Sequence, residues 1–167
     1  MDLHKKEAGI ANKPSQNSQD ILDDINQKYN ITTQQLKQLI KQKEESIPLY
    51  IFDNEELSGL QFIVKYLKEN KNLNYSKIAR KINRNPKTIW TTYQHAKQRL
   101  PERFEEQETE LSIPVNIFCD RKLSVLEHIT RHLKEVYDLN YTEIAKLLRR
   151  SPKTIWTVYQ RVNKKLG

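Results

Sequence analysis

The sequence predicts an all-α protein: two tandem three-helix units joined by an acidic linker, preceded by a short helical hairpin and a disordered N-terminus. Three observations support this prediction. The chain contains a long internal repeat, apolar residues recur at helical spacing within each copy, and helix start signals precede each apolar stretch. The predicted segments are a tail at 1–18, a hairpin at 19–45, a first repeat at 46–100, a linker at 101–111 and a second repeat at 112–167.

The repeat organises the 167-residue chain. Residues 46–100 align without a gap to residues 112–166 at a constant offset of 66, and about half of the aligned positions are identical. A gapless match of that length does not arise by chance, so the two copies are expected to share one fold.

Charge follows the same boundaries. The chain carries a formal net charge of +8, which divides into zero for residues 1–45, +6 for each repeat and −4 for the linker. A basic excess on each folded unit is expected of a protein that binds a phosphate backbone. A lysine-rich surface that only keeps a small domain soluble would give the same charge.

The first 45 residues contain two kinds of segment. Residues 1–18 are polar and are expected to be disordered. Ile21–Tyr29 and Thr33–Glu45 read as two short helices with a turn at Tyr29-Asn30 and apolar residues on one side. This is too little core to stand alone, so the hairpin is expected to dock on a repeat, on its twin in a dimer or on another protein. Its neutral charge argues against contact with DNA.

The first helix of each copy follows an Ile-Pro segment. Because the residue before proline is pushed out of the helical region, residues 46–52 and 112–118 are predicted to be extended. Ser58 and Ser124 then stand as N-caps before an apolar stripe at helical spacing. The stripe consists of Leu60, Ile63, Val64 and Leu67 in the first copy and Leu126, Ile129 and Leu133 in the second.

Two further helices are predicted in each copy. A short second helix starts after Asn74 and Asn140, which suit N-cap positions. A third helix starts at Asn85-Pro86 and at Ser151-Pro152, since proline at the first helical position needs no N–H donor and its φ is already set.

The third helix has an apolar face and a polar face. With Ile89 and Ile155 facing inward, a helical advance of about 100° per residue gathers the apolar residues around them and places polar residues opposite. Such polar side chains can donate to phosphates or reach base edges. The outward residues are Lys87, Thr91, Gln94 and Gln98 in the first copy and Lys153, Thr157, Gln160 and Lys164 in the second.

A short helix with an Ile-Ala pair, a tight polar turn and a capped helix with a buried Ile form a helix-turn-helix, whose second helix enters the major groove of DNA. Residues 143–166, EIAKLLRRSPKTIWTVYQRVNKKL, resemble the helix-turn-helix of region four of primary sigma factors and of LuxR-type response regulators. Residues 77–100 keep the pattern, except that Lys77 replaces the Glu and Asn85 the Ser. The resemblance covers about 24 residues in each copy.

The resemblance implies which residues face DNA, because the last helix is the recognition helix in those families. Arg84, Arg150 and Arg161 are further candidates, for phosphate contact. Trp90 and Trp156 have two readings, stacking on the sugar-phosphate edge or capping a small core. Carried over by position, the DNA-facing residues are Lys87, Thr88, Thr91 and Gln94, with Lys153, Thr154, Thr157 and Gln160.

These features predict a sequence-specific double-stranded DNA-binding protein, a transcription regulator that reads two similar half-sites. Direct and inverted arrangements of the half-sites both stay open. An extended linker would span about 40 Å, enough to set the units one turn of DNA, about 34 Å, apart. The alternative is a non-catalytic protein-interaction or assembly adaptor built on the same fold.

Other classes of function lack their residues. Three glycines are too few for a Gly-rich phosphate loop, and the single Cys119 excludes an intrachain disulfide and a multi-cysteine metal site. His128 and His132 have metal-ligand spacing but no completing ligand nearby in the sequence. We therefore expect no catalysis, no cofactor and no metal, and, with no membrane-spanning or signal-like stretch, a cytoplasmic protein with no membrane partner.

Overall fold

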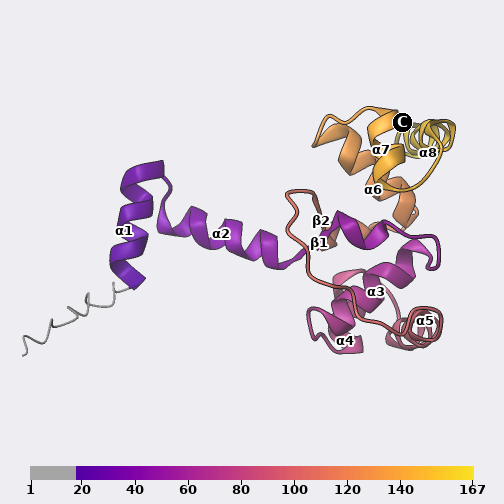
Figure 1. Cartoon of the computed structure of the whole chain (residues 1–167), viewed down its shortest axis with the longest axis horizontal. Coiled ribbons are helices and arrows are strands. Elements are labelled where there is room, and N and C mark those ends of the chain that lie inside the picture. Colours follow the sequence, from indigo (N-terminus) through magenta and orange to yellow (C-terminus); the bar gives the residue numbers. More distant parts are fainter. Residues whose placement is uncertain (1–17) are drawn as a thin grey trace, which may run out of the picture. The chain divides into compact units, whose positions relative to one another are not determined.

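The computed structural model describes residues 18–167, so almost all of the predicted tail at 1–18 lies outside the described residues. The chain divides into two compact units, one ending at Lys41 and the other comprising Gln42–Gly167. Over the described part, helix dominates and one small two-stranded sheet is present (Figure 1). The prediction of a mainly helical chain is confirmed at this level.

Two helices stand where the hairpin was predicted. Helix α1 spans Ser18–Tyr29 and α2 spans Thr33–Glu44, with Asn30 at a positive φ of 53° between them. Figure 1 shows the two helices running in different directions from this turn rather than back along each other. No side chain from 20 to 41 is buried, and Ile21 and Leu39 are about half exposed, so the expected apolar contact between the helices does not form a core.

Each copy of the repeat forms a short strand, a 3-10 turn and three helices. The first copy consists of β1 (Ser46–Pro48), η1 (Leu49–Phe52), α3 (Gly59–Glu69), α4 (Tyr75–Lys81) and α5 (Pro86–Arg99). The second copy consists of β2 (Ser112–Pro114), η2 (Val115–Cys119), α6 (Val125–Glu135), α7 (Tyr141–Leu147) and α8 (Pro152–Leu166). The extended prediction for 46–52 and 112–118 therefore holds only for the first three residues, because the chain turns directly after each proline.

The predicted caps start these helices. Ser58 and Ser124 each form a capping box, with Gln61 and Glu127 as the reciprocal side chains. Asn140 and Glu143 form the capping box predicted for the second copy. Asn85 and Ser151 accept backbone N–H bonds ahead of the prolines that begin α5 and α8. Local hydrogen bonding thus fixes the helix starts as read from the sequence.

A single hydrophobic core runs through both copies. It includes Ile63, Ile78 and Ile89 of the first copy and their equivalents Ile129, Ile144 and Ile155, none more than 2% exposed. Within each copy the third helix packs on both preceding helices. The turn before it is tight, with Asn83 and Arg149 at positive φ in equivalent positions.

The strands join the two copies. β1 and β2 pair in antiparallel register, with Ile47 opposite its own equivalent Ile113 and Ser46 opposite Pro114. Just beyond the strands, Leu49 N–H donates to Leu111 O and Val115 N–H donates to Glu45 O, both at 2.9 Å. Since 49 and 115 are equivalent, as are 45 and 111, these two bonds are the same contact made twice in opposite directions.

Other contacts between the copies are reciprocal in the same way. Helix α4 packs on η2, and its equivalent α7 packs on η1. The Asn83 side chain donates to Cys119 O at 3.3 Å, and Arg149, equivalent to Asn83, pairs with Asp53, equivalent to Cys119. Gly59 lies so close to its equivalent Val125 that an added Cβ would come within 2.6 Å of Val125 Cγ1. An exchange of equivalent partners defines a two-fold arrangement, so the copies form an intramolecular pseudo-dimer.

The linker does not set the spacing of the copies. Phe104 lies against Phe62 and Tyr66 of α3, with ring centroids 6.1 Å and 6.5 Å away, and its carbonyl accepts a bond from Asn70. Phe104 thus anchors the linker to α3, and the acidic residues of the linker lie on either side of it in the sequence. The extended spacer expected from the sequence is therefore wrong, because the copies pack directly on each other through the strands and the core.

One buried hydroxyl leads to a prediction of stability. Thr130 in α6 is fully buried and its Oγ1 has no hydrogen-bond partner, whereas the first copy has Val64 at this position, also fully buried. Thr130→Val should raise the free energy of unfolding by about 1–2 kcal/mol, because an unpaired buried polar group is removed. Urea denaturation checks this, and the mirror variant Val64→Thr should lose a similar amount. Unchanged or lower stability of Thr130→Val would contradict it.

Candidate nucleic-acid interface

The outward face of α5 begins at the capped N-terminal end of the helix. Lys87, Thr88 and Gln94 are exposed and Thr91 is half-buried, while Ile89 is fully buried on the opposite side. Pro86 at the first position leaves the N-terminal end open, where the helix dipole favours an anion. The face predicted from helical periodicity is therefore a solvent-facing surface.

Helix α8 presents the same face in the second copy. Lys153, Thr154 and Gln160 are exposed, Thr157 is half-buried and Ile155 is fully buried. The hydroxyls of Thr91 and Thr157 donate back to Lys87 O and Lys153 O, at 3.0 Å and 2.9 Å. Because each hydroxyl donates its hydrogen to the backbone, it remains able to accept a bond from a ligand.

A groove lies along the outward face of α5. It has a volume of about 630 Å³ and is walled on its other side by the N-terminal end of α3. Most of the lining residues carry a polar group, and Leu60 is the one wholly aliphatic side chain among them. The lining residues are Ser58, Leu60, Gln61, Asn85, Lys87, Thr88, Thr91, Thr92 and His95.

Sequence reasoning did not assign Ser58, Gln61 and His95 to this site. Ser58 was read only as a cap, yet it lines the groove as well. The approach of α3 to α5 creates the groove, and spacing along either helix carries no signal of that approach. For His95 the sequence did carry a signal, because a helical advance of about 100° per residue from Ile89 places it on the outward side of the third helix.

The three candidate arginines lie in different surroundings. Arg84 is half-buried, and its guanidinium donates to Ile82 O and Asn83 O, which places it in the turn before α5. Arg150, its equivalent, is exposed, as is Arg161 on α8. The structure therefore gives Arg84 a role in holding the turn, while Arg150 and Arg161 extend the basic surface of the second copy.

Trp90 and Trp156 are each 51% exposed. Half of each indole is therefore covered by the protein and half is accessible to solvent, so neither ring is a fully packed cap on the core nor a free side chain. Each ring lies next on the helix to Lys87 and Gln94 or to their equivalents, which are three or four residues away. The two indoles thus border the outward faces of α5 and α8.

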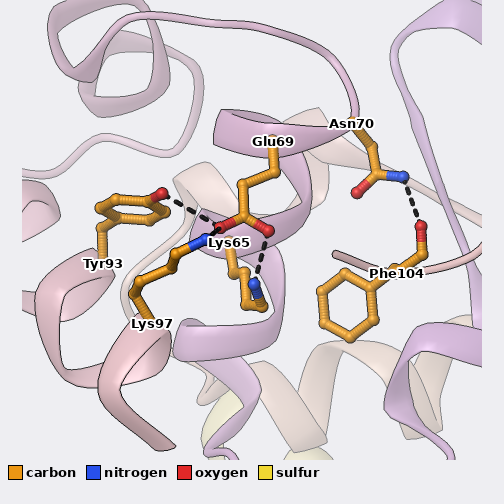
Figure 2. A network of polar contacts seen from close by, with 6 residues as sticks. All are labelled: Lys65, Glu69, Asn70, Tyr93, Lys97 and Phe104. Atoms are coloured by element: carbon orange, nitrogen blue, oxygen red, sulfur yellow. Dashed lines mark hydrogen bonds and ion pairs between the residues drawn. The ribbon is translucent and has the colours of Figure 1, made fainter. Parts of the chain in front are cut away.

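A polar network fixes α5 against α3, as Figure 2 shows. Glu69 at the end of α3 pairs with the fully buried Lys65, and it accepts bonds from Tyr93 Oη at 3.0 Å and Lys97 Nζ at 3.3 Å. Tyr93 and Lys97 belong to α5. The ring of Phe104 from the linker lies 5.6 Å from Lys65 Nζ. The carboxylate of Glu69 therefore links α3 to α5, and the linker packs against the buried lysine of the same network.

This network changes the pKa of its members. Burial by itself raises the pKa of Glu69. Hydrogen bonds from Lys65, Tyr93 and Lys97 lower it by more than burial raises it, so the net pKa lies below the ordinary value. Burial and the bond to Glu69 raise the pKa of Tyr93 to about 12. Both shifts favour an ionised Glu69 that accepts bonds from neutral Tyr93 and cationic lysines.

The second copy has a weaker version of the network. Glu135 accepts from Arg131 at 2.9 Å and from Tyr159 Oη at 3.4 Å, and Asn163 replaces Lys97. The side chains of Arg131 and Glu135 are 44% and 41% exposed. A different pair, Lys165 and Glu127 at 2.7 Å, ties the end of α8 to the start of α6.

The residues considered for metal binding have other partners. His128 Nε2 lies 2.7 Å from Asp120 O, His132 packs edge-on against Tyr137, and Cys119 Sγ lies 2.7 Å from Lys81 O. Burial lowers the pKa of His132. Across residues 18–167 no cluster of three or more His, Cys, Asp or Glu side chains could hold a metal ion.

The chain matches no protein-family model, and no curated protein or solved structure is significantly similar to it. In the described part of the chain, no helix has both the length and the apolar character needed to cross a bilayer.

Proposed function

We propose that the chain is a sequence-specific double-stranded DNA-binding protein, a transcription regulator without catalysis of its own. Each copy acts as a helix-turn-helix in which α4 or α7 supports a recognition helix, α5 or α8. One observation carries the proposal: both third helices expose the same capped, basic and amide-rich face, with the same residues at equivalent positions.

The chemistry of that face suits the major groove. A lysine and a helix N-terminus offer positive charge to phosphates, and glutamine and threonine offer the donors, acceptors and methyl groups that distinguish base pairs. Both recognition helices share the stretch Pro-Lys-Thr-Ile-Trp-Thr, so the two half-sites should be similar. The net charge of +6 on each repeat supplies the attraction to the backbone.

The basic face also distinguishes this proposal from an assembly adaptor. A protein partner would be expected to cover an apolar surface, but the outward residues of α5 and α8 are polar or charged, apart from the two half-exposed indoles. The face is suited to an anionic partner that presents hydrogen-bonding edges.

Selection from random duplexes with the purified full-length chain tests the proposal. We expect enrichment of a two-part site whose binding constant falls steeply with salt, by about one log unit per phosphate contact for each tenfold rise in salt concentration. Absence of both enrichment and salt-dependent binding would refute DNA binding and would favour the adaptor.

A further inference from the structure

We infer that a single chain reads an inverted, palindromic DNA site. The inference rests on the proposed function and adds what the sequence left open, the relative orientation of the two half-sites and the number of chains that bind them. It follows from the symmetry with which the two copies pack.

The strand pairing and the backbone bonds beside it occur as reciprocal contacts between the two copies. Ile47 pairs with Ile113 at the centre of the antiparallel register, and Gly59 packs against Val125, so two pairs of equivalent residues meet each other. Equivalent residues meet in this way only where a two-fold axis passes between them. In a translational stack, residue i of one copy would touch residue j of the next with no return contact.

The outward faces border the surface through which this axis passes. The groove along α5 is lined by Ser58 and Gln61, which flank Gly59 at the start of α3. Gly59 in turn abuts Val125 at the start of α6. The surface therefore runs from α5 to the axis, and by the same symmetry from the axis to α8. Figure 1 shows α5 and α8 end-on, on the same side of their unit.

A two-fold protein surface fits DNA in only one orientation of the half-sites. The duplex backbone has its own two-fold axes perpendicular to the helix axis, and dimeric helix-turn-helix proteins match them by binding palindromes. A direct repeat would need the two recognition helices to be related by translation along the groove. The copies here share a continuous core and a sheet, so they cannot turn over independently to read a direct repeat.

Because the two recognition helices are similar but not identical, we expect the two half-sites of the palindrome to be similar but not identical in base sequence. Equivalent outward positions are identical at Lys87, Thr88, Thr91 and Gln94, and differ at His95 against Arg161 and at Gln98 against Lys164. The half of the site bound by α8 should therefore be held more tightly to its backbone.

The test uses the duplex enriched by the full-length chain and three altered forms of it. One form has a half-site reversed to make a direct repeat, one has five base pairs inserted between the half-sites, and one has a single half-site. Five base pairs are about half a helical turn and place the half-sites on opposite faces of the duplex.

We expect the enriched site to be inverted, and the reversed and spaced forms to bind at least about tenfold more weakly, close to the single half-site. Native mass spectrometry should show one chain on the inverted duplex. Preference for the direct repeat, equal binding at both spacings, or two chains on one palindrome would overturn the inference while leaving DNA binding intact. Failure to bind any duplex would overturn the inference together with the proposed function.

Discussion

The double variant Lys87→Ala/Lys153→Ala should bind the enriched duplex about 30-fold more weakly near 0.15 M salt, with the slope of log K against log salt shallower by about 2. Each lysine is exposed on the first turn of a recognition helix and offers one charge to a phosphate. Losing one phosphate contact in each copy removes about one released counterion from each half of the site. Fluorescence anisotropy at several salt concentrations measures both quantities.

A matched control variant separates the effect of the outward faces on DNA binding from the effect of net charge. Lys37→Ala/Lys41→Ala removes the same two charges from exposed positions of α2. It should leave affinity within about twofold and the salt slope unchanged, because these lysines lie outside the proposed interface. Equal weakening by the two double variants would mean that bulk charge, and not the outward faces of α5 and α8, governs binding.

Glu69→Gln should lower the free energy of unfolding by about 3–5 kcal/mol, because it leaves the buried Lys65 without its carboxylate partner. The equivalent change in the second copy, Glu135→Gln, should cost less than about 1 kcal/mol, since its pair with Arg131 is exposed to solvent. Urea denaturation of the two variants compares the same substitution at equivalent positions. Similar costs for both would show that burial of the network does not matter to stability.

The contribution of Glu69 depends on pH with a definite sign. Its pKa is lower in the folded chain than in the unfolded chain, so its stabilisation is complete above the unfolded value, near 4.3, and is lost as pH falls through the folded value. The stabilities of wild type and Glu69→Gln should therefore begin to converge as pH falls below the unfolded pKa and should meet only below the lower, folded pKa. The convergence also tests whether the network holds α5 through an ionised carboxylate.

Local signals predicted the helices well. The serine and asparagine caps and the Asn-Pro and Ser-Pro starts act within four residues of themselves, and they place the starts of α3 to α8 where the structure has them. The inward positions of Ile89 and Ile155, and with them the outward faces, follow from helical geometry alone. Arg84 was expected to contact phosphate, and its bonds to the carbonyls of Ile82 and Asn83 in the turn could not be foreseen from the sequence.

Contacts between distant segments account for what the sequence did not reveal. The repeat shows that two copies exist, yet neither copy carries a signal that Ile47 would pair with Ile113 or that Gly59 would meet Val125. The turn after each proline, the groove beside α5 and the anchoring of Phe104 also depend on packing between elements. Symmetry between the copies is therefore a tertiary property, and the half-site orientation could be inferred only from the structure.

Amide chemical-shift mapping of the ¹⁵N-labelled chain with the enriched duplex tests the central claim most directly. If one chain contacts one duplex through both recognition helices, the largest shifts should fall in residues 84–95 and 150–161 and should saturate together at one chain per duplex. Shifts concentrated in α1 and α2, or in only one of the two recognition helices, would contradict the account.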